Sequence, residues 1–184
     1  MLSRRQFLEA GALLVSPEVL AAAQHAHEMT RQGNRARLEF FDAKSAVEIE
    51  SLAETILPED DTPGARKAGV IYFIDRALVT FNRNQQYLYR KGLKSAEVVR
   101  KRLFPGSLSI ERLSAEERIQ LAQAIEKSEF FETLRMHTVM GFLAHPNWGG
   151  NQAEVGWKLI GFDNAMIFRP PFGYYDDPNN GYVK

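Results

Sequence analysis

Apolar side chains recur at three- and four-residue spacing through most of the chain between residues 45 and 142. Val47, Leu52 and Ile56 follow this spacing early in the chain, and the same period returns in four later segments. Such spacing places the apolar side chains on one face of an α-helix. No segment shows the sustained alternation that a half-buried strand requires. The sequence therefore predicts a mainly α fold, a small bundle of about five or six helices.

Local signals indicate where these helices begin. Ser45 with Glu48, and Ser114 with Glu117, have the spacing of a capping box, in which two exposed N–H groups are satisfied reciprocally. The pair Thr62-Pro63 has the order of a cap followed by a first-position proline. We therefore expect helices to start at each of these three places and at Ser128, and we expect Pro58 to end the first of them.

A third helical pattern runs from about residue 85 to residue 104, with Leu88, Gly92, Ala96, Val99 and Leu103 on one stripe. Glycine weakens a helix interior, but the period continues through Gly92. We therefore expect Gly92 to mark a close contact with another helix rather than a break.

Charge and composition exclude several classes of function. The chain carries 23 basic and 23 acidic side chains, so it has no net charge to attract nucleic acid. It contains no cysteine, which excludes thiolate nucleophiles, disulfides and cysteine-ligated iron–sulfur clusters in this chain. We therefore expect no nucleic-acid partner.

The first residues have the parts of an export signal. Arg4 and Arg5 precede Phe7, Leu8 and a moderately apolar stretch that ends in three alanines. This is the arrangement of a secretory signal peptide, and the paired arginines match the twin-arginine signature. The alternative is an ordinary amphipathic first helix. We expect residues 1–23 to be a twin-arginine signal peptide and the mature protein to be periplasmic.

The rest of the chain divides by composition. Polar residues without a period follow the signal, and the last residues combine prolines with aromatics. Adjacent prolines favour an extended course, and exposed aromatics are typical of interfaces. We expect a polar linker (24–44), a helical domain (45–162) and an extended, aromatic-rich C-terminal arm (163–184).

The sequence contains none of the common motifs that carry catalytic chemistry. The sequence lacks the glycine-rich nucleotide motifs, the G-x-S-x-G elbow and the H-E-x-x-H metal motif. His137 has apolar neighbours and is expected to be a satisfied core histidine. His145 lies in a loop rich in proline, glycine and tryptophan, where it either caps the loop or makes a functional contact. We expect no catalytic, cofactor-binding or metal-binding residue in this chain.

The stretch from 141 to 162, GFLAHPNWGGNQAEVGWKLIGF, resembles the signature of the gluconate 2-dehydrogenase subunit 3 family. LAETILP at 52–58 and TPGA at 62–65 are similar to the opening helix and turn of that family. Two positions depart from it. His145 stands where many relatives have aspartate, and Asp163-Asn164 stand where many have Pro-Gly.

The resemblance implies a non-catalytic small subunit of a periplasmic FAD-dependent sugar or polyol dehydrogenase. The large subunit of such complexes, of the glucose–methanol–choline type, holds FAD and in some members an iron–sulfur cluster. A cytochrome subunit carries electrons onward in some of them, and membrane association comes only through partners. The small subunit assists folding, stability and twin-arginine export. The alternatives are an independent periplasmic binding or scaffold protein without a flavin partner, and an independent enzyme that uses His137 or His145.

Aromatic and loop residues near the C-terminal end are the expected contacts with such a partner. The segment at 141–162 and the arm both contribute to this expected interface. Its residues are His145, Trp148, Asn151, Trp157, Phe168, Phe172, Tyr174 and Tyr175.

Overall fold

The computed structural model describes residues 38–165, which contain six α-helices and no β-strand. The predicted mainly α bundle is confirmed for this part of the chain. The helices are α3 (Ala43–Ile56), α4 (Val70–Val79), α5 (Gln86–Leu103), α6 (Ala115–Ile125), α7 (Glu129–Leu143) and α8 (Val155–Leu159), with short 3-10 turns η1 (Arg83–Gln85), η2 (Pro146–Trp148) and η3 (Gln152–Glu154). The predictions for eight residues lie outside the described range: Arg4, Arg5, Phe7, Leu8, Phe168, Phe172, Tyr174 and Tyr175.

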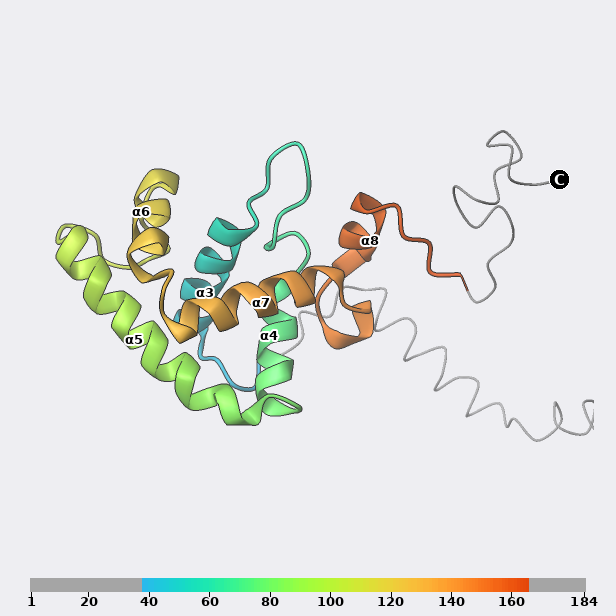
Figure 1. Ribbon diagram of the computed structural model, residues 1–184, viewed down its shortest axis with the longest axis horizontal. Coiled ribbons are helices and arrows are strands. Elements are labelled where there is room, and N and C mark those ends of the chain that lie inside the picture. Colours follow the sequence, from blue (N-terminus) through green and yellow to red (C-terminus); the bar gives the residue numbers. More distant parts are fainter. Residues whose placement is uncertain (1–37, 166–184) are drawn as a thin grey trace, which may run out of the picture.

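Helix α7 forms the centre of the bundle. It packs against α3, α4 and α5 along its length and against α8 near its end. Figure 1 shows α7 running across the molecule, with α5 and α6 toward one end and α8 at the other. The core between these helices contains side chains with no exposed surface, among them Ile49, Leu52, Ile74 and Leu134. No helix within residues 38–165 combines the length and apolar character needed to cross a membrane.

The caps confirm one predicted helix start and correct another. Ser114 and Glu117 form the expected capping box at the start of α6. The capping box predicted at Ser45 is wrong, because Asp42 is the N-cap of α3 and its carboxylate accepts a hydrogen bond from the Ser45 N–H at 2.7 Å. This hydrogen bond lowers the pKa of Asp42. Glu48 does not take part in the cap, and its side chain is buried in the core.

The helix predicted to start at Thr62-Pro63 begins later. The residues after Pro63 form turns, and α4 starts at Val70 behind Gly69, which has a positive φ of 65°. Thr62 is used locally, since its N–H and hydroxyl both bond to Asp60. The end predicted for the preceding helix is confirmed, because α3 stops at Ile56, just before Pro58.

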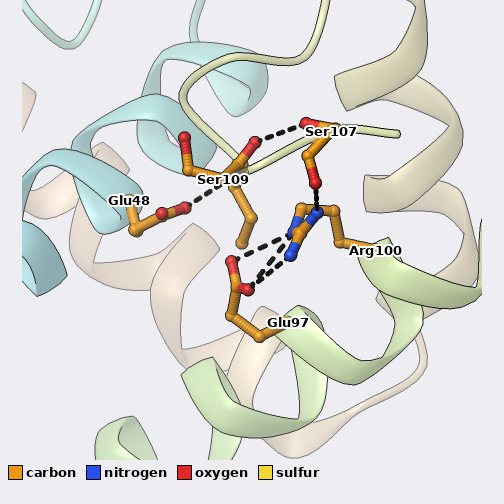
Figure 2. A network of polar contacts seen from close by, with 6 residues as sticks. Glu48, Glu97, Arg100, Ser107 and Ser109 are labelled. Carbon is orange, nitrogen blue, oxygen red and sulfur yellow. Dashed lines mark hydrogen bonds and ion pairs between the residues drawn. The ribbon is translucent and has the colours of Figure 1, made fainter. Parts of the chain in front are cut away.

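A buried polar network fastens the connection between α5 and α6. Figure 2 shows Glu97 and Glu48 approaching this connection from α5 and α3. Arg100 is 2% exposed, pairs with Glu97 at 3.0 Å and donates to the carbonyl oxygen of Ser107. Glu48 accepts from the Ile110 N–H at 2.8 Å. Burial raises the pKa of Glu48, against the opposing effect of that hydrogen bond.

The stripe predicted on α5 is partly shifted. Gly92 and Ala96 are buried as expected, but Leu103 is exposed, and Tyr89 and Arg100 take the remaining buried positions. A Cβ on Gly92 would overlap the ring of Phe130 on α7. The close helix contact predicted at Gly92 is therefore confirmed.

His137 is the satisfied core histidine that the sequence predicts. Its ring has no exposed surface and lies 2.8 Å from the Tyr89 hydroxyl and 2.6 Å from the Asn82 side-chain amide. Burial lowers the pKa of His137 and raises that of Tyr89, so it favours the neutral form of both side chains.

The first described residues pack onto the helices. Asp75 on α4 is buried, and its carboxylate accepts hydrogen bonds from the N–H groups of Glu39, Phe40 and Phe41 at 2.7 to 3.0 Å. The ring of Phe41 is itself buried in the core. The segment before α3 is thereby fixed to the side of α4.

Candidate functional site

Exposed apolar side chains gather where the end of α7 meets η2. Phe81, which follows α4, is 50% exposed, and Trp148 at the end of η2 is 47% exposed. Their rings meet edge to face with centroids 5.7 Å apart. Met140 and Leu143 on α7 are exposed beside them. An exposed cluster of large apolar side chains indicates a binding surface.

This cluster surrounds an open pocket with a volume of about 410 Å³. We refer to it as the Trp148 pocket. All lining side chains are apolar except one histidine. They are Phe73, Phe81, Met140, Leu143, Ala144, His145 and Trp148.

The loop that carries Trp148 is held in place on both sides. The imidazole Nδ1 of His145 accepts from the Asn147 N–H at 3.2 Å, which is the loop-capping role considered for this residue. Arg76 on α4 donates to the Asn147 carbonyl oxygen at 2.6 Å. Gly149 has a φ of 100°, and a Cβ there would press on the backbone of Tyr72. The turn after Trp148 therefore needs glycine.

Asn151 supports this loop from inside. Its side chain has no exposed surface, donates to the Ala144 carbonyl oxygen at 3.0 Å and accepts from the Gly156 N–H at 2.8 Å. Trp157 is also buried, and its indole N–H donates to the Leu143 carbonyl oxygen at 2.8 Å. Both residues tie α8 to the end of α7.

Of the four described residues expected at the partner interface, two therefore line the pocket and two lie beneath it. His145 and Trp148 line the pocket. Asn151 and Trp157 hold the backbone that presents them. The other four expected residues belong to the arm, outside the described range.

The loop also contains strained backbone. Asn151, Ala153 and Glu154 all have positive φ values, between 47° and 59°. For residues other than glycine this conformation is unfavourable and persists only where surrounding contacts hold it. The contacts here are the Asn151 side chain and the hydrogen bond from the Gln152 N–H to the Ala68 carbonyl oxygen at 2.9 Å. These contacts hold the loop in the strained conformation.

A row of aromatic contacts continues from the pocket toward the end of the described chain. The rings of His145 and Trp157 lie 5.5 Å apart, and those of Trp157 and Phe162 lie 5.1 Å apart. Phe162 is 47% exposed and Ile160 beside it is exposed as well. The apolar surface therefore extends past α8.

Sequence reasoning missed Phe81, Met140 and Leu143. Phe81 lies beyond the end of α4 and is half exposed. The sequence did contain a signal for Met140 and Leu143, because α7 has apolar residues on more than one face. A surface helix with a single buried stripe is apolar on one face only.

Within residues 38–165, no three His, Cys, Asp or Glu side chains lie close enough together to hold a metal ion. His145 is the single titratable group among the pocket-lining residues. The pocket is an apolar surface with one imidazole among its lining side chains. Such a surface is suited to binding another apolar surface.

Comparison with protein families gives a match to gluconate 2-dehydrogenase subunit 3 over residues 43–163. The matched region is about two thirds of the chain. The chain belongs to this family. The match confirms the resemblance seen in the sequence, and it contains all six described helices and the Trp148 pocket. No curated protein and no solved structure gives a significant match.

Membership of the gluconate 2-dehydrogenase subunit 3 family is consistent with an accessory subunit of a dehydrogenase complex. The structure adds to this a preformed apolar surface, built largely from the segment at 141–162 that carries the family resemblance.

Proposed function

We propose that this chain is a non-catalytic small subunit of an FAD-dependent sugar or polyol dehydrogenase, and that the Trp148 pocket binds the large, flavin-containing subunit. The observation that carries the proposal is the exposed pair Phe81 and Trp148 over an apolar pocket inside the family-matched region. Aromatic side chains around a pocket are the usual energetic centre of a protein interface.

The size of the exposed surface supports a protein partner. Phe81, Trp148 and Phe162 are each about half exposed, and Met140 and Leu143 lie among them. Covering such a surface removes apolar area from water at about 25 cal/mol per Å². The side chains that gain most from a partner are therefore already clustered on one side of the bundle.

The rigidity of the surface supports binding as well. Arg76, Asn151 and Trp157 each fasten the Trp148 loop through a hydrogen bond to its backbone or to the end of α7. A surface that is ordered before binding loses less conformational entropy on association. The loop strain at Ala153 and Glu154 belongs to the same preorganised segment.

The placement of the histidines supports catalysis by the partner. His137 is enclosed between Tyr89 and Asn82, out of reach of a substrate. His145 uses one ring nitrogen to cap its own loop. The flavin, and in some complexes an iron–sulfur cluster, belongs in this proposal to the large subunit, which would oxidise the sugar.

The proposal includes a role in folding and export of the large subunit. Residues 1–23 carry the paired Arg4 and Arg5 of a twin-arginine signal. A folded large subunit bound to this chain would cross the membrane with it and reach the periplasm. Replacing both arginines by lysine should then leave both subunits in the cytoplasm. Normal periplasmic dehydrogenase activity in that variant would contradict the export role.

Co-purification tests the proposed function as a whole. The tagged chain is expressed with the large subunit encoded by the same organism, purified, and examined for flavin absorbance and sugar oxidation. We expect a yellow complex in a fixed ratio of subunits, and no flavin or dye reduction by this chain alone. The chain could instead purify without the flavoprotein, while the flavoprotein keeps its full dehydrogenase activity without this chain. That result would favour an independent binding or scaffold protein.

A further inference from the structure

The C-terminal arm of the same chain is a candidate occupant of the Trp148 pocket. The described residues stop at Ala165, and 19 residues follow it, 166–184. The pocket lining, with Phe81 and Trp148 at its edge, is apolar surface that water solvates poorly. An apolar segment attached close by would cover it in the absence of a partner.

The point at which the described chain ends favours this occupant. Phe162 contacts Trp157, Trp157 contacts His145, and His145 lines the pocket. Two ring-to-ring steps of 5.1 and 5.5 Å therefore connect the start of the arm with the pocket edge. An extended chain covers up to about 3.5 Å per residue, so the six residues from Phe162 to Phe168 reach about 20 Å.

The chemistry of the segment fits the pocket. Phe168 and Phe172 flank the adjacent prolines 170 and 171, and two tyrosines follow. Proline-rich extended segments are recognised by grooves lined with aromatic side chains, because the segment loses little entropy on binding and its prolines pack on the rings. Phe81 and Trp148 present such rings at about half exposure.

We propose that residues 166–175 occupy the Trp148 pocket of their own chain until the large subunit displaces them. This inference rests on the proposed function, because the same pocket then receives the large subunit. The tether gives the arm an effective concentration in the millimolar range, so weak contacts suffice to keep it bound. The arm protects the apolar surface of the free subunit from self-association, and a partner must bind more tightly than the arm to replace it.

A single reactive thiol measures whether the pocket is covered. The chain has no cysteine, so Met140→Cys places the only thiol on the pocket lining of the full-length chain. Its rate of reaction with a maleimide is compared with the rate after Phe168→Ser and Phe172→Ser are added. We expect reaction about tenfold faster in the serine variant, as for a pocket that the arm covers about 90% of the time. Asn179→Ser with Asn180→Ser is the matched control in the same arm and should leave the rate unchanged.

Equal rates in all three proteins would overturn the proposal. Protection that disappears when the protein is diluted would also overturn it, because the occupant would then be a second copy. Acrylamide quenching of tryptophan fluorescence in the chain without Met140→Cys gives a second readout that needs no thiol. Added large subunit, in an excess that saturates any binding weakened by the loss of Phe168 and Phe172, should slow the maleimide reaction of the Phe168→Ser, Phe172→Ser variant. Failure of that protection would contradict the proposed function while leaving the arm proposal standing.

Discussion

The rings of Phe81 and Trp148 meet edge to face at 86°, although 66 intervening residues separate them in the sequence. Phe73 lies behind Phe81, with ring centroids 6.2 Å apart. Each exposed ring is therefore held by another ring before any partner binds. Edge-to-face pairs of this kind contribute about 0.5–1.5 kcal/mol beyond their burial. The pair joins the segment after α4 to the loop that carries Trp148 and forms one edge of the pocket.

Gly92 allows α5 and α7 to approach each other. Gly92→Ala would push a methyl group into the ring of Phe130, so we expect a loss of about 1–3 kcal/mol in the free energy of unfolding, measured with urea. Gly106→Ala is the control, because a Cβ there has no neighbour within 4 Å. The close packing would be refuted if the two variants were equally stable.

The buried pair of Arg100 and Glu97 can be compared with an exposed pair of the same spacing, Arg135 and Glu132. Glu97→Gln leaves a guanidinium that is 2% exposed with a weaker acceptor, and we expect it to cost about 2 kcal/mol or more. Glu132→Gln should cost less than about 1 kcal/mol, because water screens the exposed pair. Equal effects in thermal or urea unfolding would show that burial does not matter here.

The buried His137 should make stability depend on pH. Burial lowers the folded-state pKa of His137 below the ordinary value near 6.5, so the unfolded chain binds the proton more readily. Its contribution is complete above about pH 6.5 and is lost as the pH falls below it, with a slope approaching about 1.4 kcal/mol per pH unit. The neighbours Tyr89 and Asn82 carry no charge that would offset this. Urea unfolding from pH 7.5 to 5.5 should show a smaller slope for His137→Gln than for the parent. An identical slope would contradict the assignment.

The sequence predicted those features that depend on neighbouring residues. The capping box of Ser114 and Glu117, the cap at Ser128 and the stop before Pro58 all follow from local hydrogen bonding and backbone geometry. Gly92 was also identified correctly, because a glycine within a continuing helical stripe has few explanations other than close packing.

Features that depend on distant residues were predicted less well. Glu48 has the right spacing from Ser45 for a cap, yet the N–H of Ile110, far along the chain, holds its carboxylate in the core. The Trp148 pocket has the same character. Its loop was recognised, but Phe81 and Met140 come from elements whose meeting point no local pattern reveals.

The central claim is that the Trp148 pocket binds the large subunit, and the dissociation constant of the two purified subunits tests it most directly. Two aromatic anchors that each contribute about 2 kcal/mol correspond to roughly 30-fold each in affinity. We expect the double variant Phe81→Ser, Trp148→Ser to raise the dissociation constant by at least about 30-fold. Ile119→Ser on α6, where Ile119 is 49% exposed and lies outside the pocket lining, should bind like the parent. An unchanged dissociation constant for the double variant, with its helical circular dichroism intact, would contradict the account.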